Sequence, residues 1–328
     1  MAGFLISWEG GGVVLLNRRR EAKLKVEMIA DARARVGEGP VWDPQRQVLY
    51  WTDIRTGRFF EYNPATNVNT KVYEGEWIGG FAVNKRGGFI CATWSGIGLL
   101  KLPREWHWIH RGTLRGRRLQ FNDTIADPRG RFFAGTMYDG APGTLYRFDP
   151  PNGNVTVVVD GVGISNGMGF SPDLKTMYYT DSTIRTIWAF DFNVKTGALS
   201  HKREFVKLPR TDGIPDGMTV DADGYVWSAL WYGGCVVRFD PDGKEERRIQ
   251  FPVTQTSSVM FGGKDLNELY VTTAWNGTGE PGGGLEPAGY DLRAHRGGEL
   301  YRVKLDIQGK LEFMTDFPWP RSARRPSE

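Results

Sequence analysis

Four side chains with oxygen donors occur at equivalent places along this sequence, each close to the start of a short apolar run. They are Glu38, Asn122, Asn166 and Asp216. Two carboxylates and two carboxamides make a hard donor set, which suits Ca²⁺, Mg²⁺ or Mn²⁺ better than copper. The two negative charges match one divalent cation, and so few protein ligands leave coordination positions open for water or a substrate. The pattern therefore predicts a divalent metal site that can act on a substrate oxygen.

Ordinary turn chemistry is the alternative explanation for each of these residues taken singly. Asn166 and Asp216 are both followed by glycine, and Asn-Gly and Asp-Gly are common turn dipeptides. Because all four recur in register, we favour the metal site over four unrelated turns. The sequence favours neither a histidine-ligated zinc site nor a Ser-His-Asp triad, since its four histidines do not cluster with suitable partners.

The four residues are in register because the chain repeats itself six times. Each repeat opens with a small or polar residue, continues as an apolar run, turns at a residue five positions on and enters a second β-rich run. The opening residues are Glu38, Gly79, Asn122, Asn166, Asp216 and Ser257. Repeats of roughly 40–50 residues that contain several short strands have the period of a propeller blade. We therefore predict an all-β protein, a six-bladed β-propeller, rather than two unrelated β-domains.

The propeller prediction also says where the opening residues lie. The first strand of each blade lines the central channel, so these residues should meet at one mouth of that channel. Residues 24–31 form a further strand-like segment, which we expect to pair with the last blade and close the ring. The predicted organisation is a flexible extension over residues 1–23, one propeller domain over 24–316 and a C-terminal tail over 317–328.

Charge and cysteine content exclude several classes of partner. The net charge of +4 comes from the two ends of the chain, and a neutral body argues against nucleic-acid binding. No apolar stretch is long enough for a transmembrane helix, and the N-terminal basic cluster follows the apolar patches, the reverse of a secretory signal. Cys91 and Cys235 lie in apolar runs and predict buried, reduced thiols. We expect a cytoplasmic protein, monomeric or weakly dimeric, without a nucleic-acid or membrane partner.

Several long motifs resemble the SMP-30/gluconolactonase/regucalcin-like (LRE-like) family. They are GEGPVWD (37–43), FNDTIADPRGRFFAGTM (121–137), ISNGMGFSPD (164–173), IPDGMTVDADGYVWSALW (214–231) and SVMFGGKDLNELYVTTA (258–274). The resemblance spans about residues 24–305 and implies a six-bladed sugar lactonase with one divalent ion in its channel. Position by position, it assigns metal ligation to Glu38, Asn166 and Asp216. It also implies that Asp216 is the general base and that Asn122 lies beside the metal and the substrate.

Two positions depart from the pattern of that family. Gln120 stands where the family commonly has an arginine that reaches the hydroxyls of the substrate. The acidic residue that often follows the GTM motif is not clearly kept, and Asp139 is the nearest candidate. Arg117 or Arg118 could replace the missing arginine or attract anionic substrates, but a solvated loop is the favoured interpretation of this basic segment. We therefore expect intact metal chemistry with an altered preference, towards a smaller or less polar lactone.

Aromatic residues on the same face complete the predicted substrate site. Loops after the second strand of several blades contain Trp94, Tyr138 and Trp231, and aromatic rings beside polar ligands suit a sugar ring. Loop packing is the alternative role for each ring. The predicted substrate-binding residues are Asn122, Gln120, Tyr138, Asp139, Trp231 and Trp94.

Together these residues predict a gluconolactonase-like enzyme, a metal-dependent hydrolase that opens a sugar lactone (an aldonolactone). Ca²⁺ is the first choice of ion, with Zn²⁺, Mn²⁺, Mg²⁺ and Fe²⁺ as alternatives. The ion would act as a Lewis acid on the carbonyl and acidify bound water, and Asp216 would take the proton of that water. Three alternatives stay open: a phosphotriesterase-like hydrolase, a broader-specificity lactonase, and a non-catalytic calcium-binding propeller.

Overall fold

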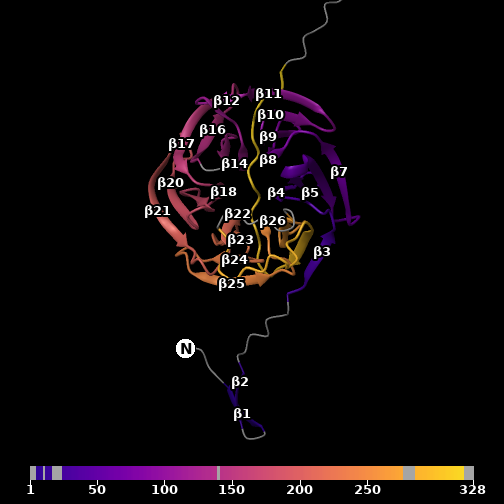
Figure 1. The fold of residues 1–328 in the computed structure, drawn as a ribbon, viewed down its shortest axis with the longest axis vertical. Helices are drawn as coiled ribbons and strands as arrows, with labels where there is room; N and C mark the ends of the chain where they lie inside the picture. Colours follow the sequence, from indigo (N-terminus) through magenta and orange to yellow (C-terminus); the bar gives the residue numbers. More distant parts are fainter. Residues whose placement is uncertain (1–4, 10–11, 17–23, 139–140, 276–284, 321–328) are drawn as a thin grey trace, which may run out of the picture.

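The computed structural model describes residues 5–9, 12–16, 24–138, 141–275 and 285–320. Within these residues the regular structure is β apart from one short 3-10 helix, η1 (Ile54–Thr56). Six four-stranded antiparallel sheets surround a central axis, which Figure 1 shows face-on. The prediction of an all-β, six-bladed β-propeller is confirmed.

Five blades each use four strands that are consecutive in the sequence. Blade 1 contains β4 (Gly37–Asp43), β5 (Val48–Asp53), β6 (Arg58–Asn63) and β7 (Val68–Glu74), and blade 2 contains β8 (Ile78–Val83), β9 (Phe89–Thr93), β10 (Gly96–Lys101) and β11 (Glu105–Arg111). Blade 3 contains β14 (Phe121–Ala126), β15 (Phe132–Thr136), β16 (Gly143–Asp149) and β17 (Asn154–Val162), and blade 4 contains β18 (Ser165–Phe170), β19 (Thr176–Asp181), β20 (Thr186–Phe192) and β21 (Leu199–Lys207). Blade 5 contains β22 (Ile214–Val220), β23 (Val226–Trp231), β24 (Cys235–Phe239) and β25 (Glu245–Gln250). A short hairpin of β12 (Thr113–Leu114) and β13 (Arg117–Arg118) connects blades 2 and 3.

Blade 6 combines strands from both ends of the propeller, as the sequence predicted. It contains β26 (Thr256–Gly262), β27 (Glu268–Thr273), β28 (Leu300–Lys304) and β3 (Val26–Ala30). β3 runs antiparallel to β28, with Met28 opposite Tyr301, so backbone hydrogen bonds close the ring. Nearer the N-terminus, β1 (Leu5–Glu9) and β2 (Gly12–Leu16) form a separate two-stranded sheet. Among the described residues, no helix has the length and apolar character needed to cross a membrane.

The inner and middle strands are buried on both faces because each blade packs between two neighbours. In β5 every residue is buried, so that strand reads as an apolar run rather than a strict alternation. Aromatic rings fill the gaps between blades: Trp42 of blade 1 stacks on Tyr270 of blade 6, with ring centroids 6.0 Å apart. Cys91 and Cys235 are buried free thiols, as predicted, and burial raises the pKa of the Cys235 thiol to about 11.

The turn-forming residue predicted five positions into each repeat lies between the first and second strands, and in several blades its side chain organises that turn. In blade 3 this residue is Asp127, whose Oδ1 accepts the backbone N–H groups of Arg129 (2.9 Å) and Arg131 (3.0 Å). Its Oδ2 binds the guanidinium of Arg131, and the side chains of this ion pair are 0% and 8% exposed. The pair therefore replaces water as the partner of a buried carboxylate.

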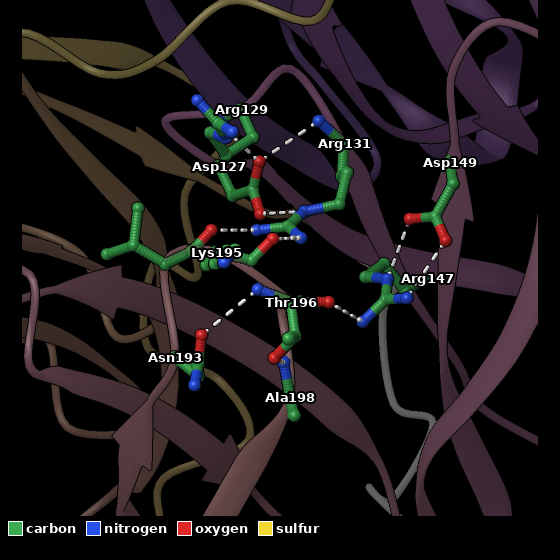
Figure 2. Close-up of polar contacts among 10 residues, drawn as sticks. Asp127, Arg129, Arg131, Arg147, Asp149, Asn193, Lys195, Thr196 and Ala198 are labelled. Carbon is green, nitrogen blue, oxygen red and sulfur yellow. Dashed lines mark hydrogen bonds and ion pairs between the residues drawn. The ribbon is translucent and has the colours of Figure 1, made fainter.

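The same arginine joins blade 3 to blade 4, as Figure 2 shows. Its guanidinium donates to the backbone carbonyls of Val194 (2.7 Å) and Lys195 (3.3 Å), which lie in the loop after β20. Arg147, held in place by Asp149, donates to the carbonyl of Thr196 in the same loop (3.0 Å). Two arginines of one blade thus satisfy backbone groups of the next.

The C-terminal strap, residues 305–320, crosses the face of the ring formed by the turns between first and second strands. It is the yellow segment that runs over the centre of the ring in Figure 1. Lys85 donates its backbone N–H to the carbonyl of Thr315 (2.8 Å), and the side-chain amide of Asn84 binds both backbone groups of the fully buried Phe317 (2.9 Å each). The strap therefore covers one end of the central channel.

Removing the buried guanidinium should destabilise the propeller strongly. Arg131→Ala leaves the Asp127 carboxylate buried without its cation, and breaking such a pair costs about 3–5 kcal/mol. Arg129→Ala, in the same turn, removes an exposed side chain and is the matched control, with an expected change within about 0.5 kcal/mol. Chemical denaturation of both variants measures the difference. Equal stabilities would contradict the assigned role of the pair.

Candidate functional site

The four predicted oxygen donors lie at the start of four inner strands and at the same end of the channel. Glu38 is on β4, Asn122 on β14, Asn166 on β18 and Asp216 on β22, and each is at most 7% exposed. These strands run from this mouth to the turns that the C-terminal strap covers. The donors therefore gather at the mouth opposite the strap.

A β-bulge lies at each of the four donors. The register between the first and second strands of a blade shifts at these points: between Glu38 and Val41, Phe121 and Thr124, Ser165 and Met168, and Pro215 and Met218. A bulge breaks the alternation of side chains and re-aims one of them. In this way a strand whose other residues pack against neighbouring blades can also direct a polar group into the channel.

The glycines that follow Asn166 and Asp216 serve close packing rather than turns. A Cβ atom on Gly167 would lie 2.5 Å from the backbone oxygen of Asp216, and one on Gly217 would lie 2.0 Å from Oγ of Ser258. Both glycines lie within strands, so the turn explanation of these dipeptides is wrong. Glycine is needed because adjacent inner strands approach one another too closely for a side chain.

A third carboxylate belongs to the same electrostatic cluster, and sequence reasoning missed it. Asp123 follows Asn122, so strict alternation would turn it away from the channel, but the bulge removes that alternation. Burial raises the pKa of Asp123 to about 6. Burial also raises the pKa of Glu38 and of Asp216 well above the usual range, and the charge of Asp123 adds to both shifts. The Asp that completes the FND motif was the available signal.

No cationic side chain of the described residues forms an ion pair with these three carboxylates. Glu38 accepts the backbone N–H of Gly39 (3.0 Å), and Asp123 accepts that of Thr124 (2.7 Å). Buried negative charges without a counter-charge are strongly unfavourable, so this cluster requires either protons or a cation. A divalent ion fits the site because hard oxygen donors and uncompensated negative charge occur together.

The carboxamides are held by hydrogen bonds that determine which atom faces the site. Nδ2 of Asn166 donates to Oγ of Ser182 (2.9 Å), and that hydroxyl donates to the carbonyl of Pro215 (2.6 Å). Oδ1 of Asn166 accepts Nδ2 of Asn122 (2.7 Å). Among the described residues no group of three or more His, Cys, Asp or Glu side chains is placed to hold a metal ion by itself. Ser182, which sequence reasoning also missed, orients the amide of Asn166.

The channel below the donors is narrow and largely apolar. A cavity of about 40 Å³ lies there, with Asp123 towards the donor end and Glu312 and Phe313 of the C-terminal strap at the other. Met168 and Met218 also line it. Substrate access is therefore from the mouth that carries the donors, because the strap and these side chains fill the opposite end.

Three of the predicted substrate-binding residues meet at one cavity. Trp94, Gln120 and Tyr138 line a hollow of about 470 Å³ together with Arg117 and Arg118, the two candidates to replace the missing arginine. The guanidinium of Arg117 lies 5.7 Å from the ring centre of Tyr138. None of the four donors lines this cavity, and Gln120, just before β14, is two residues from Asn122 in the sequence.

Trp231, another predicted substrate residue, does not line this cavity. Trp231 ends β23 in blade 5, where it bridges to Gln255 and its ring lies 6.1 Å from that of Tyr232. Tyr232 in turn packs on Tyr290, so these rings form a cluster of their own. Asp139 lies outside the described residues. The roles of all these residues in binding stay predictions.

Comparison with known proteins agrees with the motifs. Residues 36–275 match the family described as "SMP-30/Gluconolactonase/LRE-like region". A pentonolactonase, XacC, of Haloferax volcanii is 41% identical over 297 residues, which cover 89% of this chain and 99% of that protein. Regucalcin of Xenopus laevis is 35% identical over 308 residues, covering 88% of this chain and 97% of that protein. A luciferin-regenerating enzyme of known structure has a TM-score of 0.81 at 27% identity, with 89% of this chain and 99% of that chain covered.

The metal-free protein should lose stability as the pH rises through the range in which the three carboxyls ionise. Their pKa values are raised by folding, so the folded state holds protons that the unfolded chain has released. Their stabilising contribution is complete below about pH 4, the usual range for unfolded carboxyls, and is lost as the pH rises through about 6 for Asp123. Thermal unfolding in the presence of a chelator between about pH 5 and 8 measures this.

A matched pair of variants isolates the contribution of the cluster. Asp123→Asn removes one of the three charges and should flatten the pH dependence, whereas Asp242→Asn, in an exposed turn, should not. A metal-free protein that becomes more stable across this pH range, or identical slopes for the two variants, would contradict the electrostatic account.

Proposed function

Since the chain belongs to the SMP-30/gluconolactonase/LRE-like family and is a lactonase, we propose that it hydrolyses sugar lactones with the help of one divalent ion. The observation that carries this proposal is the cluster of carboxylates at the channel mouth, for which the described part of the chain supplies no cationic partner. Gln120, two residues from Asn122, lines an aromatic cavity large enough for a monosaccharide ring. The name of the Haloferax relative supports a pentonolactone or a similar aldonolactone as the substrate.

Glu38, Asp216 and the carboxamide of Asn166 would hold the ion, and their oxygen-only donor set favours Ca²⁺, with Mg²⁺ and Mn²⁺ next. When bound, the ion would supply Lewis acidity that polarises the lactone carbonyl. Ser182 contributes indirectly, because its hydroxyl keeps the amide nitrogen of Asn166 turned away from the donors. Glu38 is kept in place by the N–H of Gly39.

Asp216 would act as the base. One of its oxygens takes a proton from the attacking water, whose oxygen forms a bond to the carbonyl carbon. The ring C–O bond then breaks, and the proton passes to the departing ring oxygen, so the product is the open-chain hydroxy acid. Burial and the charge of Glu38 both raise the pKa of Asp216 in the metal-free protein, and a bound divalent ion would offset this rise and keep the carboxylate ionised to accept the proton.

Recognition of the substrate would come from the cavity beside the donors. The rings of Trp94 and Tyr138 offer apolar surfaces to the carbon face of a sugar, and the side-chain amide of Gln120 can both donate to and accept from its hydroxyls. Gln120 is uncharged, so hydroxyl contacts there are weaker than charge-assisted ones. Arg117 and Arg118 bring positive charge to the same cavity and would favour an anionic or strongly polar substrate.

Replacing the proposed base tests the reaction most sharply. Asp216→Asn keeps the shape of the side chain but cannot accept the proton, so kcat should fall by about 10³-fold or more. Asp173→Asn, in a turn on the opposite face, is the matched control and should retain wild-type turnover. Lactone hydrolysis followed by acid release measures both. Near-normal turnover in Asp216→Asn would contradict its role as base.

A second panel separates lactone hydrolysis from the phosphotriesterase alternative. Wild-type protein with Ca²⁺ should hydrolyse five- and six-membered aldonolactones with a higher kcat/KM than phosphotriesters or phosphorofluoridates. The reverse order would assign the site to phosphotriester chemistry. Metal binding without turnover of either class would assign it to the non-catalytic calcium-binding alternative.

A further inference from the structure

A second large hollow lies between blades 1 and 2, outside the ring of inner strands. Its volume is about 630 Å³, within the range of small-molecule binding sites. Four tryptophans line it, and we call it the tryptophan groove (Trp77, Trp94, Trp106 and Trp108). The lactonase chemistry proposed above uses only Trp94 of these, so the other three indoles have no role in it.

Side chains of the outer strand of blade 2 form one wall of the groove. Trp106 and Trp108 are two residues apart on β11, the outer strand, so their side chains lie on the same face. Their rings are stacked, parallel within 6° at a centroid distance of 5.0 Å. Beneath them on β10 is Gly98, where a Cβ atom would lie 3.1 Å from each ring. A glycine at this point leaves room for both indoles, which therefore lie side by side on the blade.

Loops on the donor side of the ring supply the other wall. Trp77 precedes β8 and Trp94 follows β9, and their rings meet edge to face at 4.8 Å. The guanidinium of Arg55 lies 5.0 Å from the ring centre of Trp94, and that of Arg111 lies 4.7 Å from the ring centre of Trp108. All four indoles are only partly buried. The rings are thus held in fixed orientations at a surface where they still meet solvent.

Polar groups with fixed orientations lie between the two walls. Oε2 of Glu76 accepts a hydrogen bond from Oγ of Ser95 (2.7 Å), and Oε1 lies 3.7 Å from Nη2 of Arg111. The carboxylate offers acceptors and the guanidinium offers donors, which is what a ring of vicinal hydroxyls needs. Aromatic walls with such a polar floor fit a ligand that has both apolar faces and hydroxyl edges.

We propose that the tryptophan groove binds a pyranose ring, with its C–H face against the indoles and its hydroxyls on Glu76 and Arg111. A cationic ligand is disfavoured because Arg55 and Arg111 already occupy positions over the rings. The groove also continues into the substrate cavity, since Trp94 and Arg118 line both. The bound sugar is therefore either the second residue of a disaccharide lactone or a separate sugar molecule. Only the first of these sources rests on the proposed function.

Binding of unreactive sugars tests the groove without reference to hydrolysis. Saturation-transfer difference NMR on the Ca²⁺-supplied protein would use methyl β-glucopyranoside and cellobiose, which have no lactone carbonyl. We expect transfer to the ring C–H protons, and a loss of affinity of about fivefold or more in Trp108→Ala. Trp188→Ala, which removes a partly buried indole from blade 4, is the matched control and should bind as wild type.

A second variant tests the groove independently, in case Trp108→Ala does not fold. The side chain of Arg111 is 59% exposed, so Arg111→Ala should fold normally and still bind more weakly. The proposal is overturned if neither sugar shows transfer with wild-type protein, or if Trp108→Ala and Arg111→Ala both bind as wild type does.

Kinetics then identify the source of the sugar. If the groove holds the second residue of a substrate, Trp108→Ala should lower kcat/KM for a disaccharide aldonolactone about fivefold more than for the monosaccharide lactone. If the groove holds a separate sugar, the ratio is unchanged although binding of the pyranosides is lost. Should wild-type protein hydrolyse no lactone, the proposed function fails, while the NMR result still shows whether the groove binds a sugar.

Discussion

The structure depends most on a repulsion among buried like charges. Glu38, Asp123 and Asp216 meet at one end of the channel, and no cation among the described residues offsets them. Their repulsion is tolerated because the surrounding ring holds the inner strands in place, and it is relieved when protons or a divalent ion arrive. The β-bulges at these residues turn the carboxylates into the channel. Gly167 and Gly217 allow the neighbouring inner strands to pack closely beside them.

Two closures keep that geometry in place. Pairing of β3 with β28 fixes the circumference of the ring, and the C-terminal strap covers the end of the channel away from the donors. Between blades, buried ion pairs such as Asp127 with Arg131 satisfy backbone groups of the neighbour. The four donors lie at the mouth that the strap leaves uncovered, and the cavity around Gln120 shares Trp94 and Arg118 with the tryptophan groove.

The sequence predicted the features that repeat. The spacing of the opening residues predicted six blades and placed Glu38, Asn122, Asn166 and Asp216 at one mouth. The strand-like segment 24–31 predicted the strand that closes the ring. The sequence did not predict Asp123, because a bulge overrode the alternation of a regular strand, nor Ser182, whose contact with Asn166 depends on a loop 16 residues away. Trp106 and Trp108 were missed for a similar reason: their parallel arrangement depends on the glycine of the adjacent strand.

The central claim is that the carboxylate cluster hydrolyses lactones only when a divalent ion compensates its charge. The most direct measurement is turnover of an aldonolactone by metal-stripped protein, with Ca²⁺, Mg²⁺, Mn²⁺, Fe²⁺ and Zn²⁺ added back singly and acid release as the readout. We expect no turnover after stripping and recovery with at least one ion, at a stoichiometry of one per chain. Full turnover by protein shown to contain no metal would contradict it.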